Sequence, residues 1–184
     1  MAIKSNNNQF LAASVQKWNK KRVVIRLPIR SGFRAELYTS LVENKSITNL
    51  NLLRVRYFDV EHIIDLLAVK TYNTLYLDLH MLYCFERDKL LFEALALTKS
   101  VHTLIIRVPQ YDDILIHNIW ISKLLTNRSL RRLEIILDHP HTEIGPVVEA
   151  LKNNFTLQFL GLRLRIHQRR YFEHYGVNEF RPYL

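Results

Sequence analysis

The sequence predicts an α/β fold, a right-handed curved solenoid with a parallel sheet on its concave side and helices on its convex side. Three observations predict it. A segment of alternating apolar residues recurs five times at steps of 25, 29, 29 and 27 residues. A helix-type apolar pattern precedes each segment, and a turn with Asn, Ser or Thr joins the two in most units. Self-similarity at such a period is typical of repeat architectures. The first apolar residues of the five segments are Ile47, Tyr72, Val101, Leu130 and Leu157.

The strands are expected at 22–28, 47–53, 72–79, 101–108, 130–137 and 157–164. In the last five, the fourth and sixth positions are apolar, and alternation places both on one strand face. These pairs are Leu50/Leu52, Leu75/Leu77, Leu104/Ile106, Leu133/Ile135 and Leu160/Leu162. The eighth position is also apolar, except at Arg54. A fainter first copy begins near Arg22, with Ile25 and Leu27 in the fourth and sixth positions and Pro28 ending the strand.

The helices are expected at 6–19, 35–44, 60–70, 86–98, 113–126 and 142–153. Two columns of residues, four positions apart, recur at a constant distance before the strands and therefore share a helix face. One column is Leu41, Leu66, Leu95, Leu124 and Leu151, and the other is Leu37, His62, Leu91, Trp120 and Val147. His62 is expected to be a hydrogen-bonded core histidine.

Stacked units of this kind must bend, because strands lie about 4.8 Å apart while packed helices need about 8–10 Å. The sheet is therefore expected on the inside of the curve. We expect about six repeats over residues 22–166. The end repeats have one neighbour each and need covers, which are expected from an N-terminal capping helix over 1–21 and a C-terminal cap over 167–184.

The repeated motif Leu-x-x-Asn-x-Ser/Thr, followed by Leu-x-x-Leu-x-Leu, resembles that of the leucine-rich-repeat family in its ribonuclease-inhibitor-like form. It is clearest at 41–52, 124–135 and 151–162, and the resemblance covers roughly residues 22–165. The chain departs from the family where members usually carry Asn or Cys after each strand. Those positions hold Val55, His80, Pro109, Asp138 and Arg165, so less regular loops are expected there.

The resemblance implies a non-catalytic protein–protein interaction module without a cofactor, which binds through the concave sheet. Positions three, five and seven of each strand should face that side, where arginine and aromatic residues beside aliphatic ones suit a protein interface. The predicted partner-binding residues are Asn51, Tyr76, Asp78, Ile105, Arg107, Arg132, Glu134, Ile136 and Arg163. The alternative is an ordinary mixed strand surface without a ligand.

The net charge of +9 favours acidic partners and keeps a second function open. Arg163, Arg165, His167, Arg169 and Arg170 form a basic cluster beside aromatic residues. Such a cluster could bind the phosphates of nucleic acid or of an anionic phospholipid, or it could belong to the C-terminal cap. A second basic run, at Lys17, Lys20, Lys21 and Arg22, is interpreted as solvated surface.

Neither a metal site nor a catalytic centre is expected. Asp138, His139, His141 and Glu143 could gather a metal ion, but a loop is the preferred interpretation, since no second ligand cluster is visible. Cys84, the single cysteine, is interpreted as a buried apolar residue.

The sequence favours a cytoplasmic protein. It contains no apolar run long enough to span a membrane, and its first residues lack the apolar core of a cleaved signal peptide. Small members of the family occur among eukaryotic scaffolds and among proteins that intracellular bacteria deliver into host cells. Action as such an effector in a host cell is therefore one hypothesis.

Overall fold

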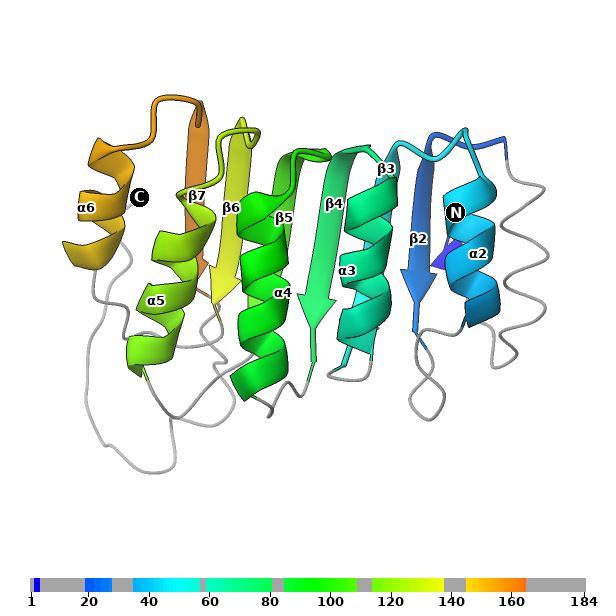
Figure 1. The fold of residues 1–184 in the computed structure, drawn as a ribbon, viewed down its shortest axis with the longest axis horizontal. Helices are drawn as coiled ribbons and strands as arrows, with labels where there is room; N and C mark the ends of the chain where they lie inside the picture. Colours follow the sequence, from blue (N-terminus) through cyan, green and yellow to red (C-terminus); the bar gives the residue numbers. More distant parts are fainter. Residues whose placement is uncertain are drawn as a thin grey trace, which may run out of the picture.

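Strands and helices alternate along the chain in the computed structural model, which describes residues 2–3, 19–27, 35–56, 59–80, 85–108, 114–137 and 145–164 (Figure 1). The strands are β1 (Ala2–Ile3), β2 (Arg22–Arg26), β3 (Asn49–Val55), β4 (Tyr72–Leu79), β5 (Val101–Val108), β6 (Arg132–Leu137) and β7 (Phe159–Leu164). The helices are α2 (Ala35–Glu43), α3 (Val60–Val69), α4 (Phe85–Leu97), α5 (Ile114–Leu124) and α6 (Gly145–Lys152). The expected caps at 1–21 and 167–184 lie largely or wholly outside the described residues.

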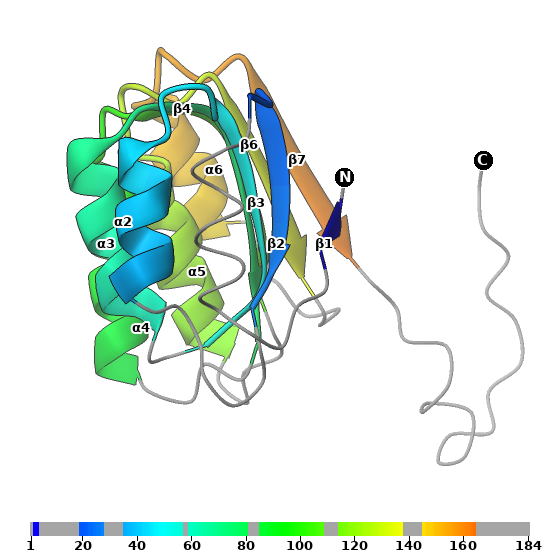
Figure 2. The ribbon, with the colours of Figure 1, turned by 90° about the vertical axis from the view of Figure 1, so that its right-hand side faces the viewer.

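The strands form one seven-stranded sheet in the order β1 to β7, and every neighbouring pair is parallel. Helices α2 to α6 all lie on one face of this sheet (Figure 2). The predicted α/β class, with helices between consecutive parallel strands, is thereby confirmed. Within the described ranges, no helix combines the length and the apolar character needed to cross a bilayer.

The strand register confirms that the leucines at the fourth position of the strands, called the leucine column here, lie side by side. Leu50, Leu75, Leu104, Leu133 and Leu160 are direct neighbours across β3 to β7. The first four are fully buried under the helices, and burying one such side chain stabilises the fold by about 1.5–3 kcal/mol. Leu160 is only partly buried, because β7 is the last strand of the sheet within the described residues.

The first repeat is out of phase with the sequence-based prediction. Val23 and Ile25, and not Ile25 and Leu27, lie beside Leu50 and Leu52. The step from the first repeat to the second is therefore two residues longer than expected. A shift of two residues keeps every side chain on its own face, so the apolar pattern alone could not detect it.

Arg54 does not take the eighth strand position, which corrects the prediction. It has a φ of 63° and lies at a register shift between Leu53 and Val55. Val55 pairs with Leu79 instead and is 0% exposed. Arg54 is thus the extra residue of a β-bulge, and the bulge restores an apolar residue to the core.

His62 is not a core residue, contrary to the prediction. It is partly exposed, and its ring centroid lies 6.1 Å from that of Tyr38 on α2. Ile63, which is 1% exposed, is buried in its place. Leu66, the other column residue in α3, is buried as predicted, so only the second column fails here, because the preceding buried residue lies three positions before Leu66 and not four.

The asparagine turns that precede the strands connect each unit to the unit before it. Oδ1 of Asn154 accepts hydrogen bonds from the main-chain N–H groups of Thr156 and Leu157 at 3.0 and 2.9 Å. Its Nδ2 donates to the main-chain oxygen of Leu125 at 2.6 Å. Asn127 has equivalent contacts on both sides. The turns are therefore stacked by side-chain amides as well as by the sheet.

In the turn between α3 and β4, Lys70 makes the contacts that asparagine makes in other turns. Its Nζ donates to the main-chain oxygens of Leu41 and Asn44, which lie six and three residues before Ile47. Asn127 bonds the corresponding oxygens of the preceding unit, those of Leu95 and Thr98. A lysine therefore makes the same connection as an amide, and burial lowers its pKa from the ordinary value.

Candidate functional site

The sheet face opposite the helices, called the open face here, carries positions three, five and seven of the strands. The register arranges them in three rows across the sheet. The first row is Arg22, Asn49, Thr74, Thr103, Arg132 and Phe159. The second row is Val24, Asn51, Tyr76, Ile105, Glu134 and Gly161. The third row is Arg26, Leu53, Asp78, Arg107, Ile136 and Arg163. All the predicted partner-binding residues belong to these rows.

A shallow hollow of about 410 Å³ lies on the open face over β2 to β6. Small side chains, those of Thr74 and Thr103, occupy the middle of the first row between longer arginines, and this difference in size leaves the space. Four predicted site residues line the hollow: Asn51, Tyr76, Ile105 and Arg132. The other lining residues are Arg22, Asn49, Thr74 and Thr103.

Arg132 is held in place at one end of the hollow. Its guanidinium carbon lies 3.9 Å above the centroid of the Phe159 ring, on the neighbouring strand. One of its terminal nitrogens lies 3.4 Å from a carboxylate oxygen of Glu134. A stacked and ion-paired guanidinium loses less conformational freedom when it binds a ligand, and it keeps further donors free.

Glu134 lies beneath the arginines and not at the surface. Its side chain is 7% exposed, and Oε1 accepts from Nε of Arg163 at 2.7 Å. Gly161, on the next strand, makes room for it, because a Cβ there would lie 3.3 Å from Cγ of Glu134 and 2.9 Å from the Phe159 ring. Glu134 therefore orients two arginines, and little of it is left to contact a partner directly.

Asp78 and Arg107 form a second ion pair in the third row. They are direct neighbours on β4 and β5, and their side chains approach to 3.4 Å. The carboxylate offsets the charge of the guanidinium here. Ile105 and Ile136, which are partly exposed, lie beside this pair and give the centre of the open face its apolar character.

Arg22 and Arg26, on β2, have no acidic partner among the described residues. The prediction interpreted Arg22 as part of a solvated basic run and took the partner-binding positions from the last five strands only. In the observed register, Arg22 and Arg26 pair with Asn49 and Leu53, so both belong to the open face. The alternation within β2, which puts Arg22 and Arg26 on the same face as Val24, is the signal that would have identified them.

Asn49 lines the hollow, but its side-chain Oδ1 is buried and has no hydrogen-bond partner among the described residues. A buried acceptor without a donor is unfavourable by about 1–3 kcal/mol.

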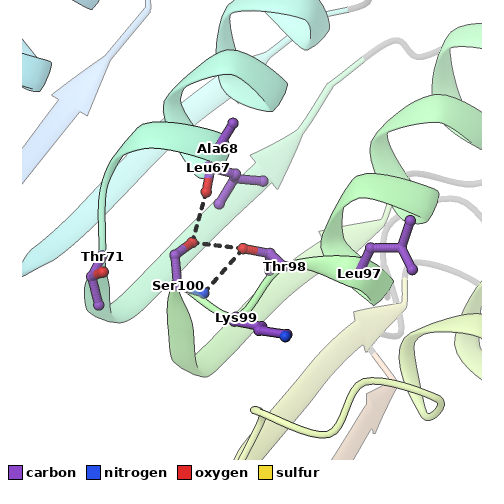
Figure 3. Close-up of a pocket in the computed structure, with 7 residues that line it drawn as sticks. All are labelled: Leu67, Ala68, Thr71, Leu97, Thr98, Lys99 and Ser100. Carbon is purple, nitrogen blue, oxygen red and sulfur yellow. Dashed lines mark hydrogen bonds between the residues drawn. The ribbon is translucent and has the colours of Figure 1, made fainter.

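A second hollow, of about 390 Å³, lies between the turns that follow α3 and α4 (Figure 3). Ser100 donates from Oγ to the main-chain oxygen of Leu67 at 2.9 Å, and its hydroxyl lies 2.6 Å from that of Thr98. The first contact joins this turn to the helix of the preceding unit, as asparagine does in other units, and the second lies within the turn. A carbonyl and a hydroxyl cannot act as the general base that a nucleophilic serine needs. This hollow is therefore a feature of the turn stacking.

The remaining sequence candidates lie elsewhere. Cys84, the possible metal ligands at 138–143 and the basic residues from Arg165 onwards are outside the described residues. Within the described ranges, no three His, Cys, Asp or Glu side chains gather as metal ligands would. Neither a protein-family model nor a curated protein sequence matches this chain.

Proposed function

We propose that this protein is a non-catalytic leucine-rich-repeat module that binds a protein partner through the open face. The observation that carries the proposal is that every predicted partner-binding residue shares one sheet face that the described helices leave uncovered. The single file of leucines supports the repeat assignment. The difference between strand and helix spacings supports a curved, right-handed array in which this face is concave.

The chemistry of the open face suits protein recognition. Tyr76, Ile105 and Ile136 offer partly exposed aromatic and aliphatic surface, and Arg132 is held above the Phe159 ring. Arginine and tyrosine are enriched among the residues that contribute most to binding energy. The side chains stand on paired strands, so binding a partner requires little ordering of the backbone.

Charge reversal at Arg132 tests the proposal. Arg132→Glu places a second carboxylate beside Glu134 and should abolish the capture of partner proteins from a lysate. Lys99→Glu makes the same charge change on an exposed residue of a turn and should leave capture unchanged. Thermal unfolding of both variants would confirm that they fold. Capture that survives Arg132→Glu would show that the open face is not the binding surface.

A basic adaptor for nucleic acid or anionic phospholipid is the second candidate. Arg22 and Arg26, without acidic partners in the described part of the chain, and the net charge of +9 favour it. It predicts binding that weakens steeply with salt. Filter binding and vesicle sedimentation at two salt concentrations separate it from protein recognition. Delivery into a host cell stays a prediction from the family resemblance.

A further inference from the structure

The hollow on the open face has positive charge at its two ends and neutral polar groups between them. Arg22 on β2 and Arg132 on β6 are the end residues of its first row, and Asn49, Thr74 and Thr103 lie between them. Arg22 has no acidic partner within the described residues. Arg132 shares the single carboxylate of Glu134 with Arg163. Both ends therefore carry guanidinium charge that is not fully neutralised.

The two ends are a fixed distance apart because the strands are paired. Four strand spacings separate β2 from β6, which is about 19 Å between backbones. An extended peptide advances about 3.3 Å per residue and points alternate side chains the same way. Acidic residues at i and i+6 lie about 20 Å apart and match this distance directly, whereas a pair at i and i+4, about 13 Å apart, needs the long arginine side chains to bend over the hollow.

The middle of the row suits a peptide backbone. Asn49 lines this space, and a side-chain amide can donate to and accept from a peptide main chain. Thr74, Thr103 and Asn51 line the same space and can both donate and accept hydrogen bonds.

We propose, building on the protein-binding function above, that the hollow binds an extended acidic segment of the partner. The segment lies across the strands, with one carboxylate at Arg22, a second at Arg132, and its main chain over the polar residues between them.

The distribution of charge favours a peptide over a nucleic acid. A single-stranded nucleic acid needs a continuous basic groove with stacking side chains. Here the arginines of the first row are separated by three neutral residues.

Peptide binding measured by fluorescence anisotropy tests the proposal with the intact protein. The probes are ten-residue labelled peptides with two glutamates at i and i+4 or at i and i+6, on a background of serine and alanine. One control replaces both glutamates with glutamine. A second control places the two glutamates side by side, which keeps the net charge and changes only the spacing.

A spaced-glutamate peptide should bind at least about tenfold more tightly than either control, as expected for a charge-assisted hydrogen bond. Arg22→Gln and Arg132→Gln should each remove this advantage, whereas Arg128→Gln, in an exposed turn, should not. Arg132→Lys, which keeps the charge, should retain part of it if Arg132→Gln proves unstable.

Equal binding of all peptides, or no effect of Arg22→Gln and Arg132→Gln, would overturn the proposal. Tighter binding of an oligouridylate than of the spaced-glutamate peptides would overturn it in favour of nucleic acid. Partner capture that depends on Arg132, together with no preference for the spaced peptides, would leave the protein-binding function standing and remove only the acidic-segment inference.

Discussion

Nδ2 of Asn127 donates to the main-chain oxygen of Leu95 at 2.8 Å, and this bond joins a turn to the helix of the preceding unit. The same nitrogen donates to the main-chain oxygen of Thr98, and Oδ1 accepts from the N–H groups of Ser129 and Leu130. Asn127 is 1% exposed. One buried amide thus satisfies four main-chain groups that neither a helix nor a strand would pair.

Asn127→Ala should lower the free energy of unfolding by at least about 2 kcal/mol, because buried donors and acceptors would lose their partner. Asn153→Ala, at an exposed position near the next turn, should change it by less than about 0.5 kcal/mol. Urea unfolding followed by circular dichroism measures both. Equal stability of the two variants would mean that the side-chain amides do not hold the turns together.

Lys70→Met should also destabilise the fold near neutral pH, because the main-chain oxygens of Leu41 and Asn44 lose their donor. A pH dependence follows from the pKa of Lys70, which burial lowers below its ordinary value of 10.5. Between the folded pKa and 10.5, the unfolded state binds more protons than the folded state. The unfolding free energy of the wild type should therefore rise with pH in this window, relative to that of Lys70→Met.

Urea unfolding of the wild type and of Lys70→Met at a series of pH values up to 10.5 measures this difference. Lys99→Met, at an exposed turn residue, is the control and should follow the wild type at every pH. A difference between the wild type and Lys70→Met that does not change with pH would mean that Lys70 titrates alike in the folded and unfolded states.

The repeated leucines could be located from the sequence because burial on one strand face requires strict alternation. Leu75, Leu104 and Leu133 are therefore in register as predicted. Alternation cannot detect a shift of two residues, so the prediction placed Ile25 where the structure has Val23. It also cannot represent an inserted residue, so Arg54 was given a core position that the bulge transfers to Val55.

The alternation could predict which residues share the open face, but it could not predict their contacts. It placed Glu134 on that face, and only the structure shows that it is buried under Arg132 and Arg163. Neither arginine is the direct neighbour of Glu134 across strands, because Arg132 precedes it by two residues on β6 and Arg163 pairs with Ile136. Which ion pairs form therefore depends on side-chain rotamers, which a pattern of apolar residues does not specify.

Truncation of a leucine in the column measures how much each unit depends on its neighbours. Leu104→Ala or Leu133→Ala should lower the unfolding free energy by about 2–5 kcal/mol, since each leaves a cavity beneath the helices. Leu97→Ala makes the same chemical change at a side chain that is 80% exposed and should have little effect. Thermal unfolding of the three variants gives the comparison. Similar melting temperatures for all of them would contradict the core described above.

Tyr72→Phe should maintain or increase stability, unlike the other buried substitutions. Tyr72 is fully buried, and its hydroxyl has no hydrogen-bond partner among the described residues. Removing an unsatisfied buried hydroxyl should stabilise the fold by up to about 1–2 kcal/mol. Denaturant unfolding at neutral pH measures the change. A loss of more than about 1 kcal/mol would mean that the hydroxyl is satisfied in solution.

The same substitution should alter the response to alkali. Burial raises the pKa of Tyr72 above its ordinary value of 10.0, so the folded state keeps its proton when the unfolded state has lost it. The stability that arises from this difference in pKa is fully present below pH 10 and is lost as the pH rises further. Wild-type protein should therefore lose stability above pH 10 faster than Tyr72→Phe does. Tyr38→Phe, at a partly exposed position, is the control and should follow the wild type.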